Sequence, residues 1–282
     1  MSLDTSQALL EKITGALAPV GGVRAIVLGG SRGRGLHHAG SDYDIGLYYW
    51  DADGIDFAAL DRAAAELNDG ARETETPIMS RFGGWGEWVN GGGWLQIGGQ
   101  PVDIMYRDLA RVDRVIAESA RGEFVCAYHY GHPHAFVSTI YAGEIATCTV
   151  LHDPQGLVAA RKGLTAAYPD ALRGTAVNRF GHEGRFFLRI AQKAAGRGDV
   201  TYVSGCAYRA AACLLQVVFA INGQWLLNEK GALALAATFE RAPKDLRPSL
   251  EAAFTELAAG PQGMLSALRA IEDLLDASSA LV

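Results

Sequence analysis

The pattern of apolar and polar positions divides the chain into two halves. In the first half, strand-like and helix-like segments alternate. The apolar, β-branched run at 23–28, the segment 43–49 and the alternating segment 100–106 predict strands. Apolar side chains recur at helical spacing over residues 5–18 and 56–68, so we expect helices there.

The second half has a different pattern. From about residue 155 the β-branched alternation ends and alanine-rich windows of helical period take over, separated by glycine-containing breaks. This predicts a helical bundle, and we place the division between the halves at residue 150, giving domains 1–150 and 151–282. The expected helices cover 155–168, 171–196, 202–221, 229–239, 244–258 and 262–277.

A glycine turn follows the first predicted strand. Gly29 and Gly30 allow a close approach of backbone to phosphate, and a helical turn beginning at Ser31 would point its N–H groups at the anion. Two other glycine motifs do not fit: no Lys follows as in a G-x-x-x-x-G-K-[ST] loop, and the residues after the turn break the G-x-G-x-x-G pattern. The turn is therefore a candidate phosphate site of another kind.

Two carboxylates follow this turn on the second predicted strand. Asp42 and Asp44 come after ten further residues, and strand alternation places them on one face. Two carboxylates on one face repel unless a cation lies between them, and Mg²⁺ prefers carboxylates together with substrate phosphates. Asp103 lies between Val102 and Ile104 on the third predicted strand, so we expect it to face the same site.

These three parts together resemble a known family. Gly30-Ser31, ten residues, Asp42-x-Asp44 and a later strand with Asp103 are similar to the nucleotidyltransferase superfamily built on the DNA polymerase beta core. Within it, the chain resembles the small-molecule branch that includes kanamycin and spectinomycin nucleotidyltransferases. The resemblance implies an α+β fold, with an N-terminal mixed-sheet nucleotidyltransferase core followed by a C-terminal α-helical bundle.

The resemblance also implies an activity and its cofactors. A nucleoside monophosphate, AMP from ATP or the equivalent from another NTP, would pass to a hydroxyl of a small molecule with release of pyrophosphate. Two Mg²⁺ ions would be held by Asp42, Asp44 and Asp103, and the turn from Gly29 to Ser31 would grip the β- and γ-phosphates. The alternative is an antitoxin-like enzyme that adenylylates a partner protein.

Further candidate residues carry open alternatives. Arg32 either contacts the triphosphate or lies in a solvated loop, and Lys230 is assigned to the nucleotide phosphates by general resemblance alone. A tryptophan- and glycine-rich segment at 82–94 is either an acceptor-binding loop or a hairpin whose tryptophans fill an interdomain core. Glu87 within it is a candidate general base. Glu183 lies on a polar helical stripe that either contacts the acceptor or is solvated.

Composition and net charge limit the kinds of binding partner that we expect. The net charge of −6 and pI of 5.6 disfavour nucleic acid as a partner and suit a cationic, aminoglycoside-like acceptor. The four cysteines form no C-x-x-C pair and no secretory leader is evident, so we expect reduced thiols and a cytoplasmic location. The apolar run 210–221 is too short to span a bilayer, which predicts a core helix and no membrane association.

The histidine-rich tract at 128–134 resembles a metal site by composition. His129, His132 and His134 lie within it, but no cysteine or carboxylate accompanies them at a zinc-site spacing. We therefore favour a polar loop over a structural metal site for this tract.

Overall fold

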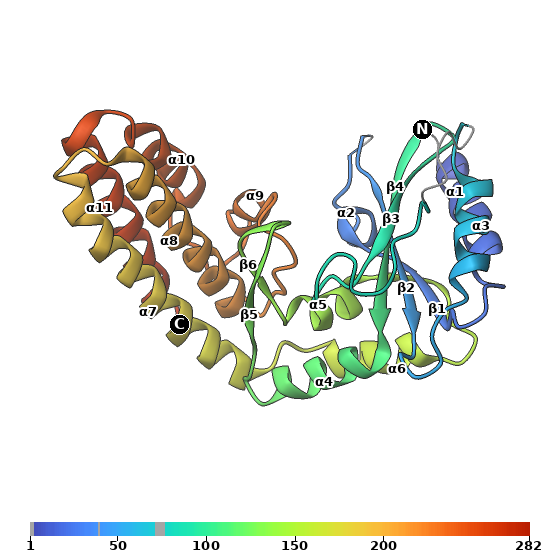
Figure 1. Ribbon diagram of the computed structural model, residues 1–282. Helices are drawn as coiled ribbons and strands as arrows, with labels where there is room; N and C mark the ends of the chain where they lie inside the picture. The colour runs from blue at the N-terminus through green and yellow to red at the C-terminus, as the bar shows by residue number, and fades with distance from the viewer. Residues whose placement is uncertain (1–2, 39, 71–76) are drawn as a thin grey trace. The chain divides into compact units, whose positions relative to one another are not determined.

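The computed structural model describes residues 3–38, 40–70 and 77–282, which fall into two compact units (Figure 1). One unit, here called the sheet unit, comprises Met1–Ala117 and Tyr141–Ala166, and the other, the helical unit, comprises Glu118–Ile140 and Ala167–Val282. Each unit is discontinuous in sequence. The chain therefore passes from one to the other three times.

The sheet unit contains a five-stranded sheet of order β3-β4-β2-β1-β7. The pair β2–β4 is parallel, whereas β1–β2, β3–β4 and β1–β7 are antiparallel, so the sheet is mixed. The predicted α+β fold with a mixed sheet in the N-terminal half is confirmed. The strands are β1 (Ala25–Leu28), β2 (Tyr43–Tyr49), β3 (Gly92–Ile97), β4 (Gln100–Asp108) and β7 (Thr149–His152).

One face of this sheet forms the core with helices. Tyr43, Ile45 and Ile104 on β2 and β4 are fully buried in the same cluster as Ile13 and Leu60 of the helices α1 and α3. Because strand side chains alternate between faces, residues 44 and 103 point to the opposite face. The helices of this unit are α1 (Leu3–Leu17), α2 (Gly30–Gly33), α3 (Phe57–Leu67), α4 (Leu109–Ala120, which continues past the unit boundary), α5 (Ile140–Thr147) and α6 (Leu157–Thr165).

The opposite face carries a buried ion pair. Arg107 of β4 is 3% exposed and donates from Nε and Nη2 to the two carboxylate oxygens of Glu144 on α5, at 2.6 and 2.7 Å. Its Nη1 donates to the backbone oxygen of Tyr106. This bidentate contact holds α5 against the sheet, at a position further along β4 than residue 103.

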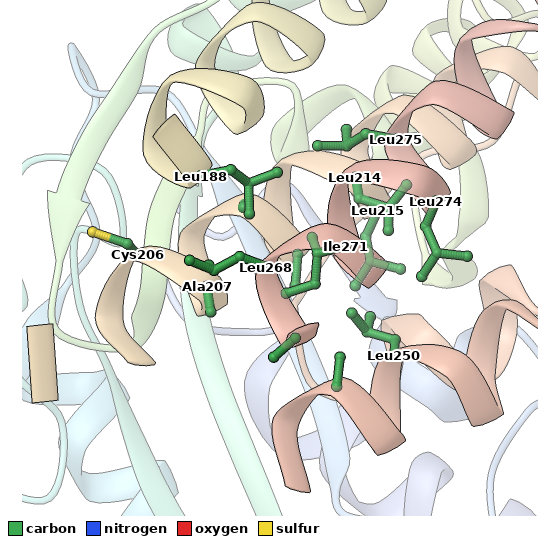
Figure 2. Close-up of a cluster of buried hydrophobic side chains, with 14 of the residues drawn as sticks. Leu188, Cys206, Ala207, Leu214, Leu215, Leu250, Leu268, Ile271, Leu274 and Leu275 are labelled. Atoms are coloured by element: carbon green, nitrogen blue, oxygen red, sulfur yellow. The ribbon is translucent and has the colours of Figure 1, made fainter. Parts of the chain in front are cut away.

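The helical unit is organised around α8 (Val200–Ile221), most of whose side chains are buried. Figure 2 shows leucines and isoleucine from α7, α8, α10 and α11 meeting in its core. By length and composition α8 alone among the described helices resembles a membrane span, but 72% of its apolar window is buried inside the protein. The other helices are α7 (Asp170–Ala195), α9 (Ala232–Ala236), α10 (Leu246–Glu256) and α11 (Gly260–Ser279).

A two-stranded hairpin belongs to the helical unit. Its strands β5 (Cys126–His129) and β6 (His132–Val137) occupy the tract that we expected to be a polar loop. Val137 packs with Phe180 of α7 and Val217 of α8. This packing explains why the compact units do not coincide with a single division at residue 150: the hairpin lies before that residue in sequence but packs with the helices that follow it.

Candidate active site

The glycine turn lies directly against one of the acids. The Gly29 N–H donates to the backbone oxygen of Asp44 at 2.7 Å, and the helical turn α2 begins at Gly30, one residue before the expected start at Ser31. Gly30 has a φ of +56°, and a Cβ placed on it would lie 1.7 Å from Oδ2 of Asp44. Glycine is therefore required at residue 30 by both the backbone conformation and the position of the carboxylate.

The acids lie on adjacent strands. Asp44 of β2 is the direct register partner of Asp103 on β4, and neighbouring strands are about 4.8 Å apart. Asp42 precedes the first residue of β2 and is two residues from Asp44, so alternation places it toward the same face. All three are half-buried. Three hard carboxylate donors on one face of a sheet are a ligand set suited to Mg²⁺.

Arg32 supports the segment that leads to the acids. Its Nε donates to the backbone oxygens of Ser41 and Asp42 at 3.1 Å, and its Nη2 donates to Ser41 at 2.8 Å. The guanidinium also lies over the Tyr43 ring, 3.8 Å from the centroid. These contacts give Arg32 a structural task on the loop between Ser31 and Asp42, and its contact with a triphosphate stays a prediction.

Arg34 is a cation close enough to Asp44 to interact with its charge. It is half-buried on the glycine turn, and its Nε donates to the Gly30 oxygen at 3.2 Å. Burial lowers the pKa of Arg34, and the negative charge of Asp44 opposes this effect. Nothing in the amino-acid sequence distinguishes Arg34 from Arg32, because their different contacts depend on the conformation of the turn.

An exposed aromatic pair lies beside the acids. Trp94 of β3 is the direct register partner of Asp103 and is 66% exposed. The Trp85 ring stacks on it, with centroids 4.4 Å apart and planes 20° from parallel. Trp88 is directed elsewhere, because its ring lies under Arg111 and its backbone oxygen accepts from the Tyr141 hydroxyl. Two of the three tryptophans of the 82–94 segment therefore form one surface next to a candidate metal ligand.

The remaining predicted residues stay predictions. Glu87 is exposed, and its backbone oxygen accepts a hydrogen bond from Nη1 of Arg111. Lys230 belongs to the helical unit, where it is exposed and its backbone N–H donates to Asn228. Glu183 lies in the same unit, half-buried on α7. Nothing in the described contacts assigns these three side chains to the acids.

Comparison with known proteins finds a domain family that matches the first part of the chain. Residues 10–73 match the model of the nucleotidyltransferase domain family, a range that includes Gly29–Ser31, Asp42 and Asp44 and ends before Asp103. A solved nucleotidyltransferase-like protein from Exiguobacterium sibiricum 255-15 is similar to this chain, with 10% sequence identity, a TM-score of 0.43, and coverage of 99% of this chain and 78% of that one. No curated protein matches.

Proposed function

From the premise that this chain is a transferase carrying a nucleotidyltransferase domain, we propose that it moves AMP from ATP to a hydroxyl of a small molecule and releases pyrophosphate. The observation that carries the proposal is the register pair Asp44–Asp103 beside the Gly30 turn, with Asp42 on the same face. These positions support a site in which the carboxylates hold metal beside a turn that binds phosphate. We propose that the site acts in the cytoplasm.

The three acids fit a divalent metal by their chemistry. Half-buried carboxylates from adjacent strands repel one another, and hard oxygen donors of this kind suit Mg²⁺. Asp42 and Asp44 would hold one ion and Asp103 would share in holding a second. Bound Mg²⁺ supplies charge neutralisation and alignment for the attacking and leaving oxygens.

The chain's own groups then orient the reactants. The turn residues Gly29, Gly30 and Ser31 would bind the β- and γ-phosphates, with the Arg34 guanidinium close by. The acceptor oxygen forms a bond to the α-phosphorus while the bond to the β-phosphate oxygen breaks, and pyrophosphate leaves with the electron pair. The hydroxyl proton passes to a base, for which Glu87 is our candidate.

The acceptor proposal rests on the aromatic surface and on charge. The stacked pair Trp94 and Trp85 offers an exposed ring face beside Asp103, suited to the apolar face of a sugar or to a cationic group. The net charge of −6 also favours a cation. We therefore propose a cationic, hydroxyl-bearing small molecule of the aminoglycoside type.

Titration calorimetry tests the nucleotide site without knowledge of the acceptor. ATP should bind in the presence of Mg²⁺ and lose most of its affinity after chelation, because the three acids repel a triphosphate without the metal. Asp44→Asn should remove the metal-dependent part of binding, whereas Asp51→Asn, a change at an exposed acid just beyond β2, should not. Equal affinity with and without Mg²⁺ would exclude the proposed role of the acids.

Mass spectrometry tests the acceptor. The protein is incubated with ATP, Mg²⁺ and a panel of aminoglycosides and other hydroxylated cations, and products are searched for the mass gain of one AMP. Labelling of a co-purified protein, with every small molecule unmodified, would replace this proposal with protein adenylylation.

A further inference from the structure

A second cluster of metal-ligating side chains lies within the helical unit. His134 of β6, Glu183 of α7 and Cys213 of α8 each offer one ligand atom, and these atoms all lie within 4.8 Å of one another. The three residues come from three different elements of one compact unit. None of them is among the acids or the glycine turn described above, and Glu183 was named there only as a candidate contact of the acceptor.

His134 has no visible reason to be buried in this way. Its side chain is 6% exposed, and neither Nδ1 nor Nε2 has a hydrogen-bond partner. Buried polar atoms are nearly always paired, because an unsatisfied one costs roughly 1–3 kcal/mol. An unpaired imidazole directed at a thiol and a carboxylate is therefore an indication that a ligand belongs between them.

The surrounding contacts hold the three residues in place. The backbone N–H of His134 donates to Oε1 of Glu229 at 3.1 Å, which fixes β6 at this point. Between α7 and α8, a Cβ on Gly184 would lie 3.3 Å from the Cβ of Cys213, so the two helices approach closely beside Glu183. The cluster is thus supported by the packing of the unit and not by a mobile loop.

We propose that His134, Glu183 and Cys213 bind a Zn²⁺ ion, with solvent as the fourth ligand. Imidazole nitrogen, thiolate sulfur and carboxylate oxygen are the three protein ligand types of zinc, and three such ligands plus water is a recurrent tetrahedral arrangement. Tetrahedral bonds of zinc length place ligand atoms about 3.4–3.6 Å apart. Because the ligand atoms lie within 4.8 Å of one another, the cluster needs to close by at most about 1.4 Å, which rotation of side chains can supply.

The charges around the cluster are compatible with a divalent cation. Burial, followed by the charge of Arg209, lowers the pKa of His134, and a neutral imidazole is the form that binds metals. Burial raises the pKa of the Cys213 thiol, and Arg209 and Arg179 only partly oppose this effect, so the thiol would release its proton on binding the metal. Glu183 and the thiolate together balance the two charges of zinc, so the arginines need not be displaced.

Solvent has a route to the cluster. Glu183 lines an open hollow of about 660 Å³ on α7 together with Asn178, Arg179 and His182. Of the three residues, only Glu183 lines this hollow, and His134 and Cys213 are buried, so solvent reaches the cluster through Glu183. The same hollow explains why Glu183 is the only half-buried member of the three.

Cobalt substitution tests the site on the full-length protein. Purified, reduced protein is titrated with Co²⁺, and the thiolate-to-cobalt charge-transfer band in the near ultraviolet is recorded, followed by competition with Zn²⁺. We expect one band-forming equivalent per chain, displaced by Zn²⁺. Metal bound by Asp42, Asp44 and Asp103 has no sulfur ligand and does not contribute to this band. The double variant Asp42→Asn/Asp44→Asn should therefore give the same cobalt titration.

Matched variants identify the ligands. Cys213→Ser should abolish the band, and His134→Gln and Glu183→Gln should weaken affinity at least about tenfold, the loss seen on removing even an outer-shell partner. Cys206→Ser, at another buried cysteine of α8, should leave the titration unchanged. Circular dichroism establishes whether each variant is folded. If Cys213→Ser is unfolded, the titrations of His134→Gln and Glu183→Gln test the site. No band in the unmodified protein, or an unaltered titration in His134→Gln and Glu183→Gln, would overturn the proposal.

Discussion

Gly30→Ala is the most incisive single change to the candidate active site. The added Cβ would lie 1.7 Å from Oδ2 of Asp44, whereas ordinary contact begins at 3.4 Å. The carboxylate must therefore move by about 1.7 Å, the difference between the two distances, or the turn must move away from it. Either movement separates Asp44 from the phosphate-binding turn.

The expected effect of Gly30→Ala has two parts, a loss of stability and a loss of turnover, which can be measured separately. A non-glycine residue at a left-handed φ costs ~1–2 kcal/mol in folding free energy. A displacement of about 1 Å within a catalytic constellation can cost roughly 10²-fold in rate. We therefore expect Gly30→Ala to lower the free energy of unfolding slightly and to reduce nucleotide turnover by at least about 10²-fold.

Gly35→Ala is the matched control. Gly35 follows α2 with a φ of +68°, and its added Cβ would meet nothing within 4 Å. It should share the backbone cost in urea denaturation but keep Mg²⁺–ATP binding by calorimetry and pyrophosphate release. If Gly30→Ala and Gly35→Ala lose binding equally, the argument from the Asp44 contact is refuted.

Three further predictions concern the sheet unit. Trp94→Ala should raise the KM of the acceptor by roughly 2- to 10-fold, the value of one aromatic contact, while Trp94→Phe restores it; equal loss in both variants would contradict a stacking role. Glu144→Gln should destabilise the protein by ~3–5 kcal/mol in urea denaturation, because it leaves the 4% exposed side chain of Arg107 charged without its carboxylate partner. The double variant Glu144→Gln/Arg107→Met should recover part of this loss. The N–H groups of Gly99 and Gly98 lower the pKa of Asp69, so the contribution of Asp69 to stability is present above the ordinary aspartate pKa and is lost as pH falls through the lower folded value. Asp69→Asn should therefore weaken the fall of unfolding free energy at acid pH, measured by urea denaturation. An unchanged fall would exclude the contribution.

The sequence predicted strands where an apolar run or an alternating pattern is not interrupted. Residues 43–49 form β2 at the predicted positions because one face is apolar throughout. By contrast, β3 begins with two glycines and exposes Trp94, so its strand pattern is only four residues long. The hairpin at 126–137 carries histidines and a proline, and it is a strand pair because of its packing on α7 and α8.

The two candidate sites differ in how much of each can be predicted from the sequence. Asp42 and Asp44 are two residues apart, at and just before the start of β2, so the alternation of an extended chain places them together. Their pairing with Asp103 depends on strand order, for which the family resemblance was the guide. His134, Glu183 and Cys213 are separated by long stretches of chain, and no spacing rule connects a hairpin with two helices. The zinc proposal therefore required the folded unit.

The interleaving of the two units in sequence has a practical consequence for anyone who dissects the protein. A fragment cut at residue 150 would keep the hairpin β5–β6 while discarding Phe180 and Val217, the partners that bury Val137. It would also truncate β7, the edge strand beside β1, and remove α6. Such a fragment exposes apolar surface at two places at once. Expression of the sheet unit alone calls for joining residue 117 to residue 141 and ending near residue 166, so that the hairpin is excised as an insertion.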